Sequence, residues 1–291
     1  MAYRKLLNGI TLDSNDKDGK GKMIEELVEK AGEIRKQTFE MVMKAGKGHL
    51  GGSFSCTEIL VALYYGKILR FDSSNPRWEE RDRFILSKAH GSNTLYVILA
   101  DLGFYLASEL SSFLDDGSLL SGHTDNRTPG VEIVGGSLGH GLGVASGIAL
   151  GAKLSGKDYL TFALIGDGES QEGSIWEAAM FASHHGLNNL IAVTDRNNLG
   201  SEDYTENTAR LEPLADKWRA FGWDVTSIDG HSFDEIFGAF KDVRTRQSSR
   251  PLMIIARTIK GKGISFLENT PQSHHTLPTG QYVDRAREDL K

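Results

Sequence analysis

The chain has few of the features that mark secreted, membrane-spanning or nucleic-acid-binding proteins. Its 291 residues include a single cysteine, Cys56, so no disulfide can form within the chain and a reducing compartment is expected. No run of about 18 apolar residues is present, which argues against a membrane-spanning helix. The first residues also lack an apolar stretch long enough for a signal peptide. We therefore expect a cytoplasmic protein.

The charge of the chain gives no sign of a polyanionic partner. The net charge is −6 and no basic cluster stands out, which argues against nucleic acid and membrane surfaces. Residues 1–22 are polar, with glycine, aspartate and lysine frequent toward their end, so we expect a flexible N-terminal arm. No repeat or linker-like stretch follows, and we expect residues 23–291 to form a single domain.

Apolar runs of strand type alternate with segments whose apolar residues recur at helical spacing. This alternation predicts an α/β fold, with a mostly parallel sheet and helices on both of its faces. The expected strands are a run that begins near Arg81, and the runs Leu160–Ile165, Leu190–Val193, Trp223–Ile228 and Met253–Ile259. The expected helices include Thr57–Lys67, Thr94–Leu102, Ser174–His185 and Pro213–Phe221.

Two polar turns follow neighbouring strands in the middle of the chain. The strand at Leu160–Ile165 ends in a Gly-Asp-Gly turn that contains Asp167, and the strand at Leu190–Val193 leads to an Asn-Asn pair that begins with Asn197. The helix at Ser174–His185 connects the two strands. Because such crossovers are right-handed, both strand ends are expected at one edge of the sheet. Asp167 and Asn197 would then face one crevice, where ligands of open α/β sheets bind.

The residue types of these turns suit a magnesium ion shared with a polyphosphate. A carboxylate and an amide oxygen are hard ligands that leave several positions to phosphate and water. Gly166 and Gly168 allow close approach of the backbone, and the following helix N-terminus favours an anion. A plain turn and a plain loop are the alternative, which the strand before each turn and the thirty-residue spacing disfavour.

The Gly-Asp-Gly turn, this spacing and the closing Asn pair resemble the thiamine-diphosphate-binding motif. The filling, GDGESQEGSIWEAA, is similar to that of transketolases rather than to that of 2-oxoacid dehydrogenases or decarboxylases. The resemblance covers residues 25–275 and corresponds only to the N-terminal, diphosphate-binding (PP) domain. The chain ends where a pyrimidine-binding domain would begin in that family. It therefore resembles the N-terminal subunit of a split, two-chain transketolase.

The resemblance implies a cofactor and its ligands. Mg²⁺ would be bound by Asp167, Asn197 and the carbonyl of Leu199, and would anchor thiamine diphosphate. His90, at the end of an expected strand in a Ser-Lys-Ala-His-Gly stretch, would hydrogen-bond the diphosphate. Without the resemblance, an ordinary histidine at a helix start, with no ligand, would be the favoured interpretation of His90. Further cofactor contacts are implied for Gly136, Leu138, Gly166, Gly168 and Glu169.

Histidines in glycine-rich loops are the candidate catalytic groups. His49 lies in a loop similar to the GH-x-G loop of transketolases, although Leu50 stands where the family usually has proline. By resemblance, His49 would lie on the substrate side of the thiazolium ring. His123 would contact a substrate oxygen, where a neutral imidazole can move a proton in either direction. For both residues an exposed loop histidine is the alternative. His140 stands where the family often has glutamine and receives no role.

The tail contains two adjacent histidines, His274 and His275, in a segment similar to one that folds back onto the cofactor in transketolases. We prefer His275 for the catalytic role, because the family histidine usually precedes Gly-x-Pro and Pro278 lies three residues after His275. A metal site is the alternative for the pair, and the lack of further nearby ligands disfavours it.

Two acids, Glu172 and Glu177, lie in the first turns of the expected central helix. They could simply complement the helix dipole. By resemblance they match acids that extend across a subunit interface toward the pyrimidine of the cofactor. We treat them as candidates for a proton relay in catalysis, without direct contact to the substrate.

The resemblance implies transfer of a two-carbon ketol unit from a ketose, or its phosphate, to an aldose. The pyrimidine-binding residues would come from a C-terminal partner subunit, in an α2β2 heterotetramer, so the chain alone should be inactive. One alternative is a related split enzyme that uses a sulfo- or deoxy-sugar donor. Others are an E1-type subunit of a 2-oxoacid dehydrogenase, and a non-catalytic binding subunit.

Overall fold

The computed structural model describes residues 17–291, so residues 1–16 of the expected N-terminal arm lie outside the described part. Five strands form one sheet in the order β1-β2-β3-β5-β4, and every neighbouring pair is parallel. The strands are β1 (Arg83–Leu86), β2 (Thr161–Gly166), β3 (Leu190–Arg196), β4 (Asp224–Asp229) and β5 (Leu252–Arg257). The prediction of an α/β fold with a parallel sheet is therefore confirmed.

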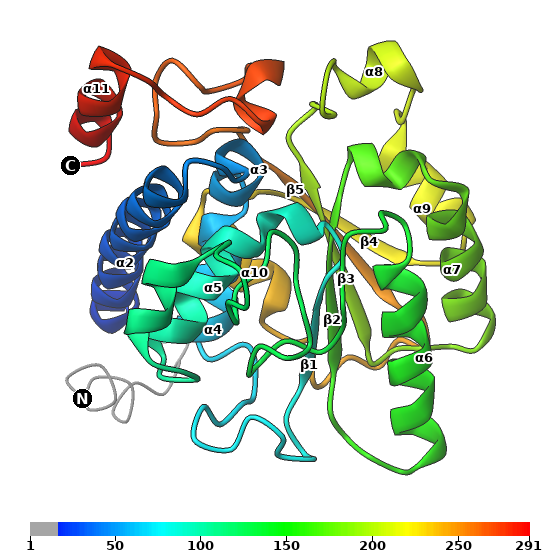
Figure 1. The fold of residues 1–291 in the computed structure, drawn as a ribbon. Helices are drawn as coiled ribbons and strands as arrows, with labels where there is room; N and C mark the ends of the chain where they lie inside the picture. Colours follow the sequence, from blue (N-terminus) through cyan, green and yellow to red (C-terminus); the bar gives the residue numbers. More distant parts are fainter. Residues whose placement is uncertain (1–16) are drawn as a thin grey trace.

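Helices cover both faces of the sheet, because the buried strands are apolar on both sides. In β2, Phe162 and Leu164 pack into one core, whereas Ala163 and Ile165 pack into the other. The first core contains α2 (Lys17–Ala45), α4 (Thr57–Tyr65), α5 (Ser92–Asp101) and α10 (Phe233–Phe240). The second contains α6 (Gly141–Leu154), α7 (Gly173–His184) and α9 (Leu214–Ala220). The three layers are seen in Figure 1.

Helix α2 begins earlier than the sequence pattern predicts. Its apolar spacing starts at Ile24, but the helix begins at Lys17, so residues 17–22 are helical and do not belong to a flexible arm. Lys20 pairs with Asp234 at the start of α10, 2.5 Å away, and Met23 is buried. These contacts with distant residues hold a polar, glycine-containing turn in the helix.

Short helical segments gather around the carboxyl edge of the sheet (Figure 1). They are α3 (Leu50–Phe54), η1 (Ala89–Gly91), η3 (Gly168–Gln171), α8 (Thr205–Thr208) and η4 (Pro271–His274). The remaining segments are η2 (Ala107–Ser112) and α11 (Gln281–Asp289). Strand β3 extends to Arg196, beyond the predicted end at Val193, and brings Asp195 beside Gly166 of β2. The polar turns after the strands therefore meet at one edge.

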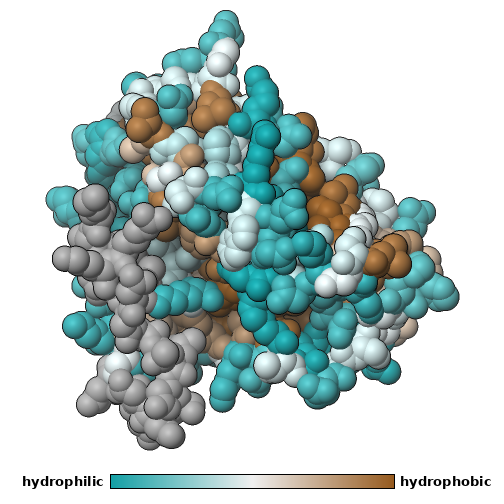
Figure 2. Space-filling view, turned by 90° about the horizontal axis from the view of Figure 1, so that it is seen from below, coloured by the Kyte–Doolittle hydropathy of each residue, from teal (hydrophilic) through white to brown (hydrophobic). Residues whose placement is uncertain are grey.

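The face seen from below in Figure 1 carries mainly hydrophilic side chains, with hydrophobic ones scattered among them (Figure 2). Among residues 17–291, no helix combines the length and the apolar character needed to cross a membrane.

Candidate functional site

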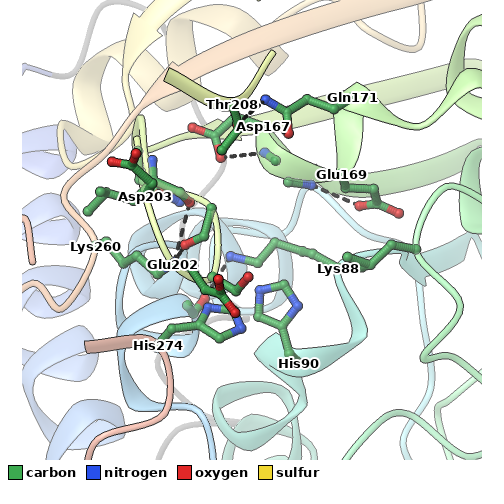
Figure 3. A pocket seen from close by; sticks show the side chains of 18 residues that line it. Lys88, His90, Asp167, Glu169, Gln171, Glu202, Asp203, Thr208, Lys260 and His274 are labelled. Carbon is green, nitrogen blue, oxygen red and sulfur yellow. Dashed lines mark hydrogen bonds between the residues drawn. The ribbon is translucent and has the colours of Figure 1, made fainter. Parts of the chain in front are cut away.

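A pocket opens at the carboxyl edge of the sheet, where the turns after four strands meet (Figure 3). Its wall includes Lys88 and His90 after β1, residues 166–169 after β2, Asn197 and residues 199–203 after β3, Lys260 after β5, and His274 of η4. Gly52 of α3 and Leu138 also line it. The crevice predicted from strand order is thus present, and Asp167 and Asn197 both face it.

A buried ion pair between Lys88 and Asp195 forms the floor beneath the pocket. The Lys88 side chain is 1 % exposed and that of Asp195 is fully buried. Asp195 also accepts hydrogen bonds from the hydroxyls of Ser55, at 2.6 Å, and Thr258. Burial opposes the charge of Lys88, but Asp195 holds the pKa of this ammonium above its usual range. The sequence pattern assigned no role to either residue, because their pairing depends on how the ends of β1 and β3 are brought together on either side of β2.

Asp167 is buried at the end of β2 and keeps an elevated pKa. Its carboxylate accepts hydrogen bonds from the backbone amides of Gly168, at 2.7 Å, and Asn198, at 2.5 Å. Arg196 donates to the same group over 3.2 Å. Burial, and then the charge of Asp195, raise the pKa of Asp167 to about 6 despite these donors. The group therefore becomes a full carboxylate only above that pH.

Lys260 is a pocket residue that the sequence pattern did not single out. Its ammonium donates hydrogen bonds to the carbonyl oxygens of Leu199, at 3.3 Å, and Gly200. Burial, and then the positive charge of Lys88, lower the pKa of Lys260 to about 8. The carbonyl predicted as a metal ligand is therefore already in contact with a cation. Lys260 and Lys88 also give the pocket two positive groups suited to an anion.

The residues present fit Mg²⁺ and a diphosphate. Asp167, Asn197 and the Leu199 carbonyl supply hard oxygen ligands, as Mg²⁺ prefers. Asn197 is itself oriented, since its side-chain oxygen accepts from the Leu199 amide at 3.1 Å. At Gly168 an added Cβ would meet only the Gly200 Cα, at 3.4 Å. Packing within the chain does not require glycine there, and its absent side chain leaves the pocket open.

Glu169 lies in the pocket wall, but its carboxylate is used by the chain itself. One oxygen accepts from the Ser87 hydroxyl and, at 2.9 Å, from the Gly139 amide; the other accepts from Gly166, also at 2.9 Å. Glu169 therefore joins the loop that carries Leu138 to the ends of β1 and β2. Three hydrogen bonds within the chain hold the carboxylate in place, and its expected contact with the cofactor stays a prediction.

Cofactor contacts are expected for two other residues of this loop, Gly136 and Leu138, and of these Leu138 lines the pocket. Leu138 is 38 % exposed and lines the pocket. Gly136 has φ +122°, which favours glycine, and a Cβ there would lie 3.6 Å from the His123 ring. His140 is exposed and its Nδ1 lies 3.1 Å from the Ser137 hydroxyl.

The structure brings four histidines together around His49. Its ring centroid lies 5.8 Å from that of His90, 5.7 Å from His123, 5.4 Å from His274 and 5.0 Å from His275. Burial, and then the neighbouring imidazoles, lower the pKa of His49 to about 4. Burial and then Lys88 hold the pKa of His90 well below its usual range. The rings of His49 and His90 are therefore neutral near pH 7.

His274, rather than the preferred His275, lies on the pocket wall. Figure 3 shows it beside His90, with ring centroids 5.0 Å apart, whereas His275 is exposed and does not line the pocket. The cause is local packing: Ser273 is buried against Gly51, where a Cβ would come within 2.5 Å of the Ser273 carbonyl. This contact turns the residue after Ser273 into the pocket. The catalytic role of His275 stays a prediction, since its ring lies 5.0 Å from that of His49.

The two helix acids do not reach the pocket. Glu172 is the N-cap of α7 and Glu177 lies within that helix, and both are exposed. Their expected contact with a partner subunit stays a prediction.

Comparison with known proteins assigns a family. A family model described as transketolase, thiamine diphosphate binding domain, matches residues 27–290. The 6-deoxy-6-sulfo-D-fructose transketolase subunit of Clostridium sp. (strain MSTE9) is 47 % identical, over 91 % of this chain and 96 % of that protein. A relative from Phocaeicola vulgatus, named for one of the subunits of apulose-4-phosphate transketolase, is 42 % identical, over 87 % of this chain and 90 % of that protein.

Longer transketolases match over part of their length. Human transketolase is 36 % identical over 86 % of this chain and 40 % of its own. The crystal structure of Campylobacter jejuni transketolase superposes with a TM-score of 0.85 at 36 % identity, covering 92 % of this chain and 43 % of that one. The chain thus spans about two fifths of the solved transketolases that it matches. It belongs to the transketolase family, as a thiamine-diphosphate-binding domain.

Proposed function

We propose that this chain is the cofactor-binding subunit of a two-chain transketolase, which transfers a two-carbon ketol unit from a ketose phosphate to an aldose phosphate. The observation that carries the proposal is the pocket at the carboxyl edge. There the hard ligands Asp167, Asn197 and the Leu199 carbonyl lie beside the ammonium of Lys260 and a group of neutral histidines. The pocket therefore brings together groups suited to a metal ion, to a phosphate and to a sugar.

In this proposal Asp167, Asn197 and the Leu199 carbonyl hold Mg²⁺. Lys260 and His90, together with the open backbone at Gly168, hold the diphosphate. Thiamine diphosphate, when bound, supplies the carbanion chemistry that breaks and forms the carbon–carbon bond beside a carbonyl. The chain orients the cofactor and provides charged groups around it. The Lys88–Asp195 ion pair forms the floor of the pocket, and Glu169 holds the loop that carries Leu138 in place.

The histidines supply proton transfer at the sugar. His49 and His274 are neutral near pH 7, and each has a buried Nδ1 without a hydrogen-bond partner among the described residues. Such an imidazole can accept a proton from a sugar hydroxyl or donate one to it. His123 lies within reach of the same group, because its ring is 5.7 Å from that of His49.

A partner subunit completes the enzyme in this account. The relatives named as subunits are matched over 90 % or more of their length, so transketolases with a separate chain of this size exist. We propose that the partner is a C-terminal transketolase subunit, in an α2β2 heterotetramer located in the cytoplasm. Glu172 and Glu177, exposed on α7, would face it.

A sulfo-sugar donor is the second candidate, since a relative named for 6-deoxy-6-sulfo-D-fructose is 47 % identical. Among the described residues that line the pocket, none is an arginine. We therefore assign recognition of the anionic end of the donor, phosphate or sulfonate, to the partner. A 2-oxoacid dehydrogenase subunit receives no support, because the relatives reported above are all transketolases.

The test is reconstitution of the two chains. The partner is purified with this chain from its host, and ketol transfer is assayed with phosphorylated and sulfonated ketoses in the presence of Mg²⁺ and thiamine diphosphate. We expect activity only with both chains. Full activity of this chain alone, or no transfer from any ketose by the complex, would refute the proposal.

A further inference from the structure

Three histidines at the edge of the pocket form a cluster that the proposed reaction does not fully use. Each of His49, His274 and His275 offers a ring nitrogen, and these atoms all lie within 4.8 Å of one another. Among the described residues no other group of three or more histidine, cysteine or acidic side chains is placed in this way. The third ligand that the sequence pattern did not show for the tail pair is therefore His49, more than two hundred residues away.

We propose that His49, His274 and His275 bind a transition-metal ion of the Zn²⁺ class, separately from the Mg²⁺ site. Imidazole suits Zn²⁺, Co²⁺ and Ni²⁺, whereas Mg²⁺ prefers oxygen ligands. Three histidines with a fourth position open to solvent are a known arrangement for Zn²⁺.

The rings of His49 and His274 already have the neutral state that a metal ion requires of its histidine ligands. A histidine ligand must be neutral, and burial lowers the pKa of His49 to about 4 and that of His274 to about 3. The Nδ1 atoms of both rings are buried without a hydrogen-bond partner among the described residues. Buried polar atoms usually have a partner, and a metal ion would satisfy those that it coordinates.

The three ring nitrogens need to move only a short distance toward one another to bind one ion. Ligands around a tetrahedral Zn²⁺, at about 2.0–2.1 Å from the metal, lie roughly 3.4 Å from one another. The nitrogens here span up to 4.8 Å. His275 is exposed and can rotate, whereas His49 and His274 are partly buried and His274 lines the pocket. His275 can therefore close the site onto the two more fixed rings.

The nearby positive charge limits the affinity. The ammonium of Lys260 acts on both His49 and His274, and it would repel a second cation. Its hydrogen bonds to the carbonyls of Leu199 and Gly200 offset part of this effect. We therefore expect reversible binding, unlike the retention of a structural zinc ion.

If the proposed function holds, occupancy of this site would affect catalysis. A metal bound at His49 and His274 removes the imidazoles available for proton transfer to the sugar. Zn²⁺ should therefore inhibit ketol transfer by the reconstituted complex, and a chelator should restore the activity.

The test is metal binding by the full chain alone, in excess Mg²⁺ to occupy the oxygen ligands. Zn²⁺ affinity is measured by competition with a chromophoric indicator, and Co²⁺ is added separately to record the visible absorption of a nitrogen-ligated ion. The exposed His275 is replaced first, as His275→Ala, because this change should leave the fold intact, as circular dichroism would verify. We expect Zn²⁺ affinity to fall at least about tenfold, since loss of even an outer-shell partner costs about 10–100-fold.

A matched control is available on α7. His184 and His185 are also adjacent and exposed, with ring centroids 5.0 Å apart, but belong to no three-ligand group among the described residues. His185→Ala should keep the wild-type Zn²⁺ affinity, whereas His49→Asn should lose it as His275→Ala does. Equal Zn²⁺ affinity in the wild type and in His275→Ala would overturn the metal site. Zn²⁺ binding by a chain whose complex transfers no ketol unit would overturn the proposed function and leave the metal site standing.

Discussion

The carboxyl group of Asp167 must be deprotonated to bind a metal ion, and its environment makes this difficult. Burial and Asp195 raise the pKa of Asp167 to about 6. Affinity for Mg²⁺, or for Mn²⁺ as its spectroscopic substitute, should therefore be constant well above that pH. Below it, affinity should fall by about tenfold per pH unit as protons compete with the metal. Titration of Mn²⁺ followed by electron paramagnetic resonance, from about pH 5 to about pH 8, measures this dependence.

The control for that experiment is Asp167→Asn, which cannot ionise. This variant should bind Mn²⁺ weakly at every pH, with no inflection near pH 6. A wild-type affinity that stays flat across the range would contradict a role of Asp167 as a ligand with a raised pKa.

Glu58 is the centre of a second network of buried charged groups, next to the segment that carries Lys260. Its carboxylate accepts from Arg35, at 2.6 Å, and from Nδ1 of His231, at 2.9 Å, while Nε2 of His231 accepts from the Ile259 amide, next to Lys260. Burial would raise the pKa of Glu58, but Arg35 and His231 bring it down to about 2. Its contribution to stability is thus complete above the unfolded pKa of about 4.3 and is lost as the pH falls through the folded value.

The change Glu58→Gln should be strongly destabilising at neutral pH, because it leaves the charge of Arg35 buried without its partner. We expect a loss of about 3–5 kcal/mol in the free energy of unfolding, measured by urea denaturation. The control is Asp216→Asn, whose partner Arg219 is 54 % exposed. It should cost no more than about 1 kcal/mol. Similar losses in the two variants would show that the network is not specially stabilising.

At the scale of the elements, the turn between β2 and η3 leaves the pocket open. Gly168 has no packing contact that excludes a side chain. We therefore expect Gly168→Ala to keep the melting temperature of the wild type and to weaken binding of inorganic pyrophosphate with Mg²⁺ by at least about tenfold, or about 1.4 kcal/mol. Isothermal titration calorimetry on the chain measures this change.

A matched variant is Gly238→Ala, in helix α10, where an added Cβ meets no atom within 4 Å. It should leave pyrophosphate affinity unchanged and should stabilise the protein by up to about 1 kcal/mol, as alanine is the better helix former. Unaltered pyrophosphate affinity in Gly168→Ala would place the anion away from this turn.

The same elements show which parts of the structure could be predicted from the local sequence pattern. The strands before Asp167 and Asn197, and the right-handed connection between them, could be predicted because they follow from apolar periodicity and chirality. Predicted boundaries moved by a few residues where contacts outside the segment extended an element. Lys20 held the start of α2, and pairing with β5 extended β3 to Arg196.

Pairings between distant segments could not be predicted. The Lys88–Asp195 ion pair and the contact of Lys260 with the Leu199 carbonyl join segments that no local pattern connects. Which of His274 and His275 lines the pocket depends on the packing of Ser273 on Gly51, which a spacing argument does not include.

At the scale of the whole molecule, the site lies at one edge of the sheet. The described pocket contains the groups proposed to bind the metal ion and the phosphate and to transfer protons, but no arginine that could bind the anionic end of the donor. The chain covers about two fifths of the solved transketolases that it matches, in keeping with the proposal that a second chain completes the site.

Native mass spectrometry of the chain, tagged and isolated gently from its host, tests most directly whether it binds the cofactor together with a second subunit. We predict a complex that holds a second subunit in equal number, with one thiamine diphosphate for each pair of chains. A chain that stays alone and carries no cofactor, at thiamine diphosphate and Mg²⁺ concentrations well above typical affinities, would contradict it.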